Sequence, residues 1–461
     1  MQARSSATGA RRIDGWLHPL YWRITGVRDA MMARVRSAGL VVAAVVVVAA
    51  CLTIGHERAP TRQLLAVAVA MGAVAVLWVL QRSARVSATR ELPRVGSVGV
   101  PMRYRVTVRN DGSRALARAW WIERPVDARP GVDEFRRQRE PGEDERNRFD
   151  RTFAWFRWQW LMWRKRSFDG GAGAEEIRLV PGGEMRVTVG LVPARRGVIE
   201  LADPRLLLPD PFGLLQRCVR VRCDVGRITI FPARHPLPRF DLPGTEAWRQ
   251  HAESDAGLAG DIGGFTGLRD YRAGDPLRRM HWRSWARTGK PMIKELEDAS
   301  EPRHALLLDT CGGDDGDEVF EACVSVAASF AMLADEDRGR IDLMFVQDGV
   351  RGVRAGAGHG GCEVLLDALA TVVAQRGGSL DALADAVLPD AGELGACLVV
   401  LHGWDEARAA FLKKLRDLGV ALVPLVVGAG ERPAGVPGHW LDARQLARDL
   451  AKLPPRLVGW D

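Results

Sequence analysis

A basic segment from Leu268 to Asp298 holds the residue types most able to do chemistry. Eight lysines and arginines against two acids between Arg269 and Lys294 make its surface positive. Asp275 is placed as a helix N-cap, Pro276 occupies the first helical position, and Gly289 is placed to end the helix. The sequence therefore predicts a short basic helix, followed by a strand.

Three interpretations of this segment stay open. In the first, the cap, the proline and Trp282 fix a helix–strand junction, with the arginines paired or solvated. In the second, the basic face is a docking surface for an acidic partner or a phosphate. In the third, the protein is an enzyme acting at the membrane surface. The residues of that enzyme would be Arg269, Asp275, His281 and Arg287.

Familiar catalytic motifs are missing from the sequence. It has no G-x-x-x-x-G-K-[ST] loop, no G-x-S-x-G elbow and no H-E-x-x-H helix, and its nine histidines are dispersed. Gly260–Gly267 is rich in glycine but has no strand before it and no helix after it, which predicts a loop. We therefore expect a protein that is not an enzyme and carries no cofactor.

A second cluster combines tryptophan with arginine, inside an apparent insertion at residues 133–170. Its first half mixes arginines with acids, which predicts a solvated, mobile stretch. Tryptophan beside arginine favours the membrane interface, where an indole has one apolar and one wet side. A helix packed on the protein's own β-sandwich is the alternative, and nothing else in the sequence favours nucleic acid. The four tryptophans are Trp155, Trp158, Trp160 and Trp163.

Two apolar runs near the N-terminus predict a transmembrane hairpin. Residues 38–55 and 64–80 carry no charge, and each is near the ~20 residues that a helix needs to cross ~30 Å of hydrocarbon. Arginines gather before the first run and after the second, so both ends should face the cytoplasm. This predicts a multi-pass protein of the inner membrane with cytoplasmic soluble domains. A cleaved signal peptide and lipoprotein processing at Cys51 are the alternatives.

The soluble part divides into a β-rich middle and an α/β end. Alternating patterns predict strands at 102–109, 177–179, 185–192, 197–201 and 227–231, typical of a small β-sandwich. After residue 303, buried strands alternate with helices, which predicts a mainly parallel sheet covered on both faces. The seven cysteines are odd in number and form no CxxC pair, so free thiols in a reducing compartment are expected.

The basic segment resembles the signature of the domain of unknown function 58 family. Arg195-Arg196-Gly197 and Asp210-Pro211-Phe212-Gly213-Leu214 match a second characteristic stretch of the same family, whereas His281 departs from the pattern, which often has Asp before the Trp. The resemblance implies a two-helix anchor, a β-rich region and a von Willebrand factor A-like end. It also implies a MoxR-type AAA+ ATPase as partner, which would bind the ATP. The signature residues, similar to the hallmark of the domain of unknown function 58 family, are Arg269, Tyr271, Gly274, Asp275, Arg278, Trp282 and Arg287.

The C-terminal part also resembles the von Willebrand factor A-like fold, whose metal site is Asp-x-Ser-x-Ser after the first strand. This chain has Asp309-Thr-Cys311-Gly-Gly313 instead. A thiol is a soft ligand poorly suited to Mg²⁺, and glycine offers no oxygen from a side chain. We expect a degenerate site that holds no metal.

Together these patterns predict a membrane-anchored interaction protein, and the family resemblance implies a role in assembling or maintaining envelope complexes. Its expected partners are the lipid bilayer, the ATPase and a second copy of the chain, and no nucleic acid is expected. The net charge of +8 suits an anionic cytoplasmic leaflet. The expected parts are an amphipathic cytoplasmic tail (1–37), the hairpin (38–80), a β-sandwich-like domain (95–235) with its insertion (133–170), the signature segment (236–302) and the α/β domain (303–461).

Overall fold

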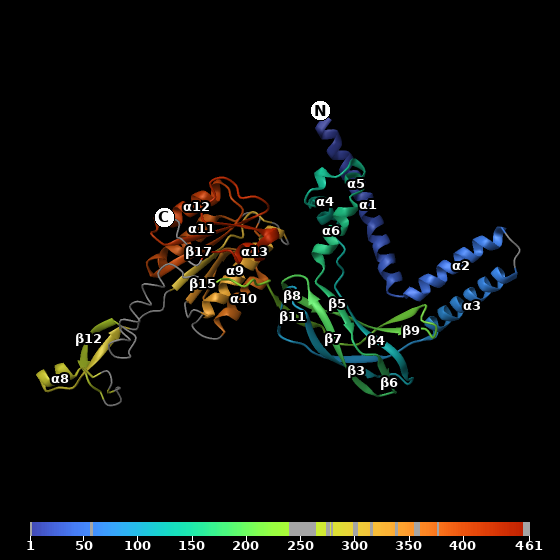
Figure 1. The fold of residues 1–461 in the computed structure, drawn as a ribbon, viewed down its shortest axis with the longest axis horizontal. Coiled ribbons are helices and arrows are strands. Elements are labelled where there is room, and N and C mark those ends of the chain that lie inside the picture. The colour runs from blue at the N-terminus through green and yellow to red at the C-terminus, as the bar shows by residue number, and fades with distance from the viewer. Residues whose placement is uncertain are drawn as a thin grey trace. The chain divides into compact units, whose positions relative to one another are not determined.

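The computed structural model describes residues 2–55, 59–238, 264–272, 277, 280–297, 303–313, 317–336, 340–354, 360–375 and 378–454. The chain divides into two compact units, Met1–Phe231 and Pro232–Asp461. Figure 1 shows the helices and strands of both units.

The first unit begins with three helices, α1 (Gln2–Met32), α2 (Ser37–Gly55) and α3 (Ala59–Gln81). Helices α2 and α3 lie side by side (Figure 1). Among the described residues, one helical stretch, Pro60–Gln81, is long and apolar enough to cross a membrane, and Ser37–Thr53 is a shorter apolar one. Large apolar side chains on both helices face outwards, among them Val41, Val47, Val67, Leu77 and Leu80.

Two sheets enclose one core in the middle of the chain, which confirms the expected β-rich region. The larger sheet has the order β1-β3-β7-β5-β4-β9-β10, with β6 paired to β4, and the smaller has the order β2-β11-β8. Buried side chains of both sheets, such as Val106 of β3 and Ile228 of β11, belong to the same cluster. The strands are β1 (Val86–Glu91), β2 (Val95–Ser97), β3 (Met102–Asn110), β4 (Leu116–Arg124), β5 (Phe168–Gly173), β6 (Ile177–Leu179), β7 (Glu184–Pro193), β8 (Gly197–Leu201), β9 (Asp203–Pro209), β10 (Gln216–Arg220) and β11 (Gly226–Phe231).

The five strands expected from alternation are confirmed as β3, β6, β7, β8 and β11. Strand β1 begins before residue 95, where the sequence placed the start of the domain. Strand β5 falls partly inside the expected insertion because its Asp-Gly-Gly-Ala-Gly sequence has no alternation. It lies between β7 and β4, and a Cβ on Gly171 would come 2.9 Å from the carbonyl oxygen of Glu123. Close backbone approach therefore selects glycine in this central strand.

Residues 133–166 are folded, contrary to the mobile stretch expected in their first half. They form α4 (Val132–Arg137), η1 (Glu143–Glu145), α5 (Arg148–Phe153) and α6 (Trp155–Lys165) between β4 and β5. The Arg157 guanidinium, 1% exposed, forms an ion pair with Glu143. The mixed charges that predicted mobility therefore partly neutralise each other inside a small helical layer.

The second unit holds a two-stranded sheet with one helix and a six-stranded sheet. The six strands have the order β16-β15-β14-β17-β18-β19, and all neighbours are parallel except the antiparallel pair β15–β16. Leu306 and Leu307 are successive in β14 and both are fully buried, so both faces of the sheet are covered. Helix α9 packs on the strands β14, β15, β17 and β18. Helices α11 and α12 pack with Leu307 in one hydrophobic cluster.

The strands and helices of this unit are β12 (Gly264–Asp270), α8 (Trp282–Thr288), β13 (Met292–Glu297), β14 (Arg303–Leu308), α9 (Glu318–Glu336), β15 (Arg340–Val346), β16 (Val350–Arg354), α10 (Gly361–Thr371), α11 (Leu380–Val387), η3 (Leu388–Glu393), β17 (Leu394–His402), α12 (Glu406–Asp417), β18 (Leu422–Gly428), β19 (His439–Asp442), η4 (Ala443–Gln445) and α13 (Leu446–Leu450). Residues 264–267 belong to β12, so the loop expected at Gly260–Gly267 is wrong for these four, and 260–263 lie outside the described residues.

Candidate functional site

Helix α8 is held against the antiparallel pair β12–β13 by a very small core. Met280 and Ile293 are 6% and 2% exposed and form an isolated β-bridge. The backbone N–H of His281 donates to the Met292 carbonyl at 2.8 Å. The helix therefore leaves directly from a segment that is hydrogen-bonded to β13.

This pairing sets the start of α8. The helix begins at Trp282 with His281 as its N-cap, and Asp275, where the sequence placed the N-cap, lies outside the described residues. The His281 ring nitrogen Nδ1 accepts from the backbone N–H of Ser284 at 3.2 Å. Because residues 280 and 281 are engaged with β13, the helix cannot start before them. Its end is as expected, since Gly289 has φ +71°.

Two tryptophans three residues apart stand on the outside of α8. Trp282 and Trp285 are 60% and 37% exposed, and their rings stack with centroids 5.4 Å apart. Arg283 and Arg287 are exposed on the same helix, and Leu277 is exposed before it. A soluble surface seldom presents so much aromatic area, and tryptophan and arginine carry most of the binding energy in interfaces. This aromatic–basic face of α8 is suited to docking.

The other signature residues spread along the same hairpin. Arg269 lies in β12 opposite Ile293, and the backbone N–H of Tyr271 donates to the Pro291 carbonyl at 3.0 Å. The sequence-predicted residues Gly274, Asp275 and Arg278 lie outside the described residues. Of the four residues weighed as an enzyme site, His281 is engaged as a helix cap.

A buried ion pair occupies the place where the sequence suggested a degenerate metal site. Asp309 follows β14 and is 1% exposed. Its carboxylate accepts from Arg408 Nε at 2.8 Å and from the backbone N–H groups of Cys311 and His402 at 2.8 and 3.2 Å. Arg408 also pairs with Asp405 and donates to the Cys311 carbonyl. Burial raises the pKa of the Asp309 carboxyl, and the Arg408 charge opposes that rise.

Cys311 and Gly313 stand where the metal site of the von Willebrand factor A-like fold has its two serine hydroxyls, and both positions are closely surrounded here. A Cβ on Gly313 would lie 3.3 Å from the Nε2 atom of His402, and the same Nε2 lies 2.8 Å from Asp317 Oδ2. Cys311 is buried, and burial raises the pKa of its thiol to about 11, so the free thiol is protonated near neutral pH. In the part of the chain that the structure describes, no group of three His, Cys, Asp or Glu residues is placed to hold a metal. A guanidinium neutralises the carboxylate that a metal would have needed.

One family comparison covers both the β12–α8–β13 segment and the strands β14 to β17 of the six-stranded sheet. A model of the family described as "Protein of unknown function DUF58" matches residues 267–402. Residues 267–402 are thus a DUF58 region. The match begins in β12 and ends at His402, the last residue of β17. It therefore includes α8 and Asp309 but not Arg408.

Comparisons with other proteins add little to the family assignment of this DUF58 chain. No curated protein matches it. Similar solved structures include the CARDB domain of a Pyrococcus furiosus protein (10% identity, 33% of this chain and 95% of that one, TM-score 0.17). They also include a PapD-like domain of human CEP192 (14%, 33% and 89%, 0.17) and an aerotolerance-related membrane protein from Bacteroides fragilis (11%, 35% and 92%, 0.22). Such TM-scores carry no argument about fold or function.

The tryptophan cluster of the DUF58 chain divides between a core and a surface. Trp158 is fully buried with Leu17 and Tyr21 of α1 and with Phe135 of α4. A membrane-interface role is therefore wrong for Trp158, whose ring is covered by α1 rather than by lipid. Trp155 and Trp160 are half-buried against the same core, and only Trp163 of the four is largely exposed, at 72%. The alternative of a helix packed within the protein is nearer to the structure, with α1 as the partner instead of the sandwich.

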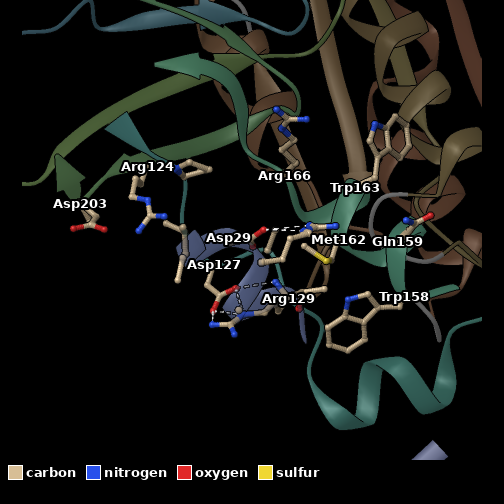
Figure 2. A pocket seen from close by; sticks show the side chains of 18 of the residues that line it. Asp29, Arg124, Asp127, Arg129, Trp158, Gln159, Met162, Trp163, Arg166 and Asp203 are labelled. Atoms are coloured by element: carbon tan, nitrogen blue, oxygen red, sulfur yellow. Dashed lines mark hydrogen bonds and ion pairs between the residues drawn. The ribbon is translucent and has the colours of Figure 1, made fainter. Parts of the chain in front are cut away.

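A cavity of about 900 Å³ lies beside this core (Figure 2). Its walls come from α1, from the residues after β4 and from α6. Asp127 and Arg129 form an ion pair on one wall, and Trp158, Met162 and Trp163 line the other (Figure 2). The cavity has the size and the mixed lining of a small-molecule site. The sequence did not indicate it, because α1 and α6 are more than a hundred residues apart.

Proposed function

We propose that this DUF58 protein is a membrane-tethered interaction protein without an enzymatic activity of its own. The supporting observation is the aromatic–basic face of α8, where Trp282 and Trp285 stack in the open between arginines. An exposed tryptophan pair is poorly explained by folding alone, because it adds solvent-exposed apolar area. Docking of a partner would bury it.

The partner that we propose is a MoxR-type AAA+ ATPase, as the family resemblance implies. ATP would bind to that partner, and this chain would present α8 to it. Cations on α8 favour an acidic surface on the ATPase. Assembly or maintenance of envelope complexes is the process that such a pair would serve.

The anchor that we propose is a transmembrane hairpin of α2 and α3 with both ends in the cytoplasm. It is supported by the apolar stretch Pro60–Gln81, by the packing of α2 on α3, and by exposed apolar side chains on both helices. Water would solvate such side chains poorly, whereas lipid would accept them. The six-stranded sheet would be a von Willebrand factor A-like domain, a proposal supported by its single antiparallel edge pair.

Removal of the tryptophan pair tests the docking proposal. The variant Trp282→Ala/Trp285→Ala is purified as the full chain in detergent and mixed with the ATPase in a nucleotide-trapped state. Hot-spot tryptophans contribute about 2 kcal/mol or more each, so capture should weaken at least about tenfold. The control is Trp163→Ala, another exposed tryptophan in the first unit. Equal capture by both variants, or capture lost equally in both, would contradict the role of α8.

A further inference from the structure

Helix α1 has two different faces, and the inner one is fixed to the protein. Leu17, Tyr21 and Thr25 are at most 7% exposed. The Tyr21 hydroxyl donates to the Phe153 carbonyl at 2.6 Å, and the ring of His18 is hydrogen-bonded to the Pro130 carbonyl at 3.0 Å. The rotation of α1 about its own axis is therefore set by these contacts, and so is the direction of its outer face.

The outer face of α1 is an apolar stripe. Trp16, Ile24, Val27 and Met31 are 65%, 47%, 58% and 56% exposed, with half-buried Leu20 between them. Their spacings of four, four, three and four residues place these five side chains on one side of the helix. These side chains remain exposed to this extent beside the described residues of the first unit, and an exposed apolar stripe of this kind marks a site of contact with a protein or a membrane.

Arginines border the stripe on both sides. At 100° per residue, Arg23 lies at one edge and Arg28 at the other, and both are exposed. Arg28 also forms an exposed ion pair with Asp29 at 3.2 Å. An apolar stripe with an exposed arginine at each edge fits a helix that lies in the headgroup region of an anionic membrane.

The stripe also leads directly into the proposed membrane helices. Met31 is six residues before the first residue of α2, which exposes Leu40 and Val41. The link is held in place, because the backbone N–H of Arg36 donates to the Leu214 carbonyl at 3.0 Å and that of Gln216 donates to the Arg34 carbonyl at 2.7 Å. The outer face of α1 is thus fixed close to the point where α2 would enter lipid.

We propose that the apolar stripe of α1 lies in the headgroup layer of an anionic lipid leaflet. This inference rests on the proposed membrane anchor. In addition to the anchor of α2 and α3, α1 then lies flat on the membrane surface and holds the helical layer of α4 and α6 against the bilayer. Trp16, Leu20, Ile24, Val27 and Met31 enter the interface, and Arg23 and Arg28 meet lipid phosphates.

Site-specific fluorescence tests the position of the stripe. A full-length chain without the accessible thiols Cys51, Cys218 and Cys223 receives one cysteine, at Val27, Asp29 or Val48, which is labelled with an environment-sensitive nitrobenzoxadiazole dye. The protein is reconstituted into phosphatidylglycerol–phosphatidylcholine vesicles with and without spin-labelled lipid. Asp29 is the matched control, exposed on another face of α1, and Val48 reports insertion of α2.

Quenching by spin-labelled lipid should be at least about threefold stronger at residue 27 than at residue 29, and strong at residue 48. Strong quenching at 48 with none at 27 would overturn the stripe proposal and leave the anchor standing. No quenching at either position would overturn both. Crosslinking between residue 27 of two copies, with no quenching there, would identify a second chain as the cover and would also overturn the lipid proposal.

Discussion

At the scale of single residues, one arginine joins the carboxyl end of the central strand β14 to helix α12. Arg408 lies on α12, and its guanidinium reaches Asp309 after β14 and the Cys311 carbonyl beyond it. Asp405, the N-cap of α12, pairs with the same group. The charge of Asp309, at the carboxyl end of β14, is therefore balanced by a cation from within the chain.

Removal of that arginine should be costly. The variant Arg408→Ala leaves the Asp309 carboxylate buried and unpaired, which typically costs about 3–5 kcal/mol. The measurement is the urea midpoint at which Cys397, fully buried in β17, becomes reactive to a dithiodipyridine reagent. Lys414→Ala, which breaks the exposed pair with Asp385, is the control and should leave the midpoint nearly unchanged, because solvent screens an exposed pair. Equal midpoints for the two variants would show that the buried pair contributes nothing.

A buried histidine should make the same unit sensitive to acid. His304 in β14 is 3% exposed, and burial lowers its pKa to about 4. The unfolded chain, with a pKa of about 6.5, binds more protons between these values, so stability falls as the pH drops from about 6.5 to about 4. The total loss is about 3 kcal/mol. His304→Leu should flatten this part of the pH profile of the Cys397 midpoint; an unchanged slope would assign it to other groups.

At the scale of elements, α1, α4 and α6 share one small core. Trp158 fills it, whereas Trp163, one and a half turns further along α6, points to solvent. Two residues of the same type on one helix thus have different roles. The difference comes entirely from which side of α6 faces α1.

The pair makes a matched test of that core. Trp158→Ala should destabilise the layer of α1, α4 and α6 by about 3–5 kcal/mol, because it leaves a large cavity. Trp163→Ala should change stability by less than about 0.5 kcal/mol. The readout is the rate at which trypsin cleaves after the arginines of residues 133–151, with the Cys397 midpoint as a check that the second unit stays intact. Similar cleavage rates in both variants would contradict a core role for Trp158.

Sequence periodicity predicted the strands whose apolar and polar residues alternate. It missed strands whose residues are selected by contacts with segments distant in the chain. Alternation located β3 and β7, because each buries one face of an antiparallel sheet. It missed β5, where Gly171 is selected by the close approach of Glu123, a contact across about fifty residues. Turn chemistry at Gly289 located the end of α8, but its start was set by pairing with β13, which a local pattern cannot reveal.

The sequence predicted only those residues of the candidate site that lie close to one another in the chain. Trp282 and Arg287 came from the signature, and the structure places both on the exposed helix. The sequence identified Asp309 as a former ligand position but gave no sign of Arg408, about a hundred residues away, as its partner. One signal was present, since Asp405 at an N-cap puts Arg408 in the first turn after β17. Only the parallel order of β14 and β17 brings that turn to Asp309.

At the scale of the whole molecule, the proposal requires the hairpin to return the chain to its starting side. Arginines at 34 and 36 precede α2, and arginines at 82 and 85 follow α3. Hydrogen bonds tie both ends to the first unit: Arg36 N–H donates to the Leu214 carbonyl, and Arg217 Nη1 donates to the Val79 carbonyl at 2.6 Å. Since both ends contact neighbouring residues of one folded unit, they must lie on one side of any membrane that α2 and α3 cross.

Cysteine labelling on intact cells tests this topology. In a chain whose accessible thiols are replaced, Arg62→Cys near the start of α3 should react with a membrane-impermeant maleimide from outside. Arg85→Cys, four residues after α3, should react only after lysis, because translocating its flanking arginines is disfavoured. Alkaline carbonate should leave both variants in the membrane fraction. Labelling of residue 85 in intact cells would place the soluble units outside, and an ATPase that works in the cytoplasm could then not reach α8.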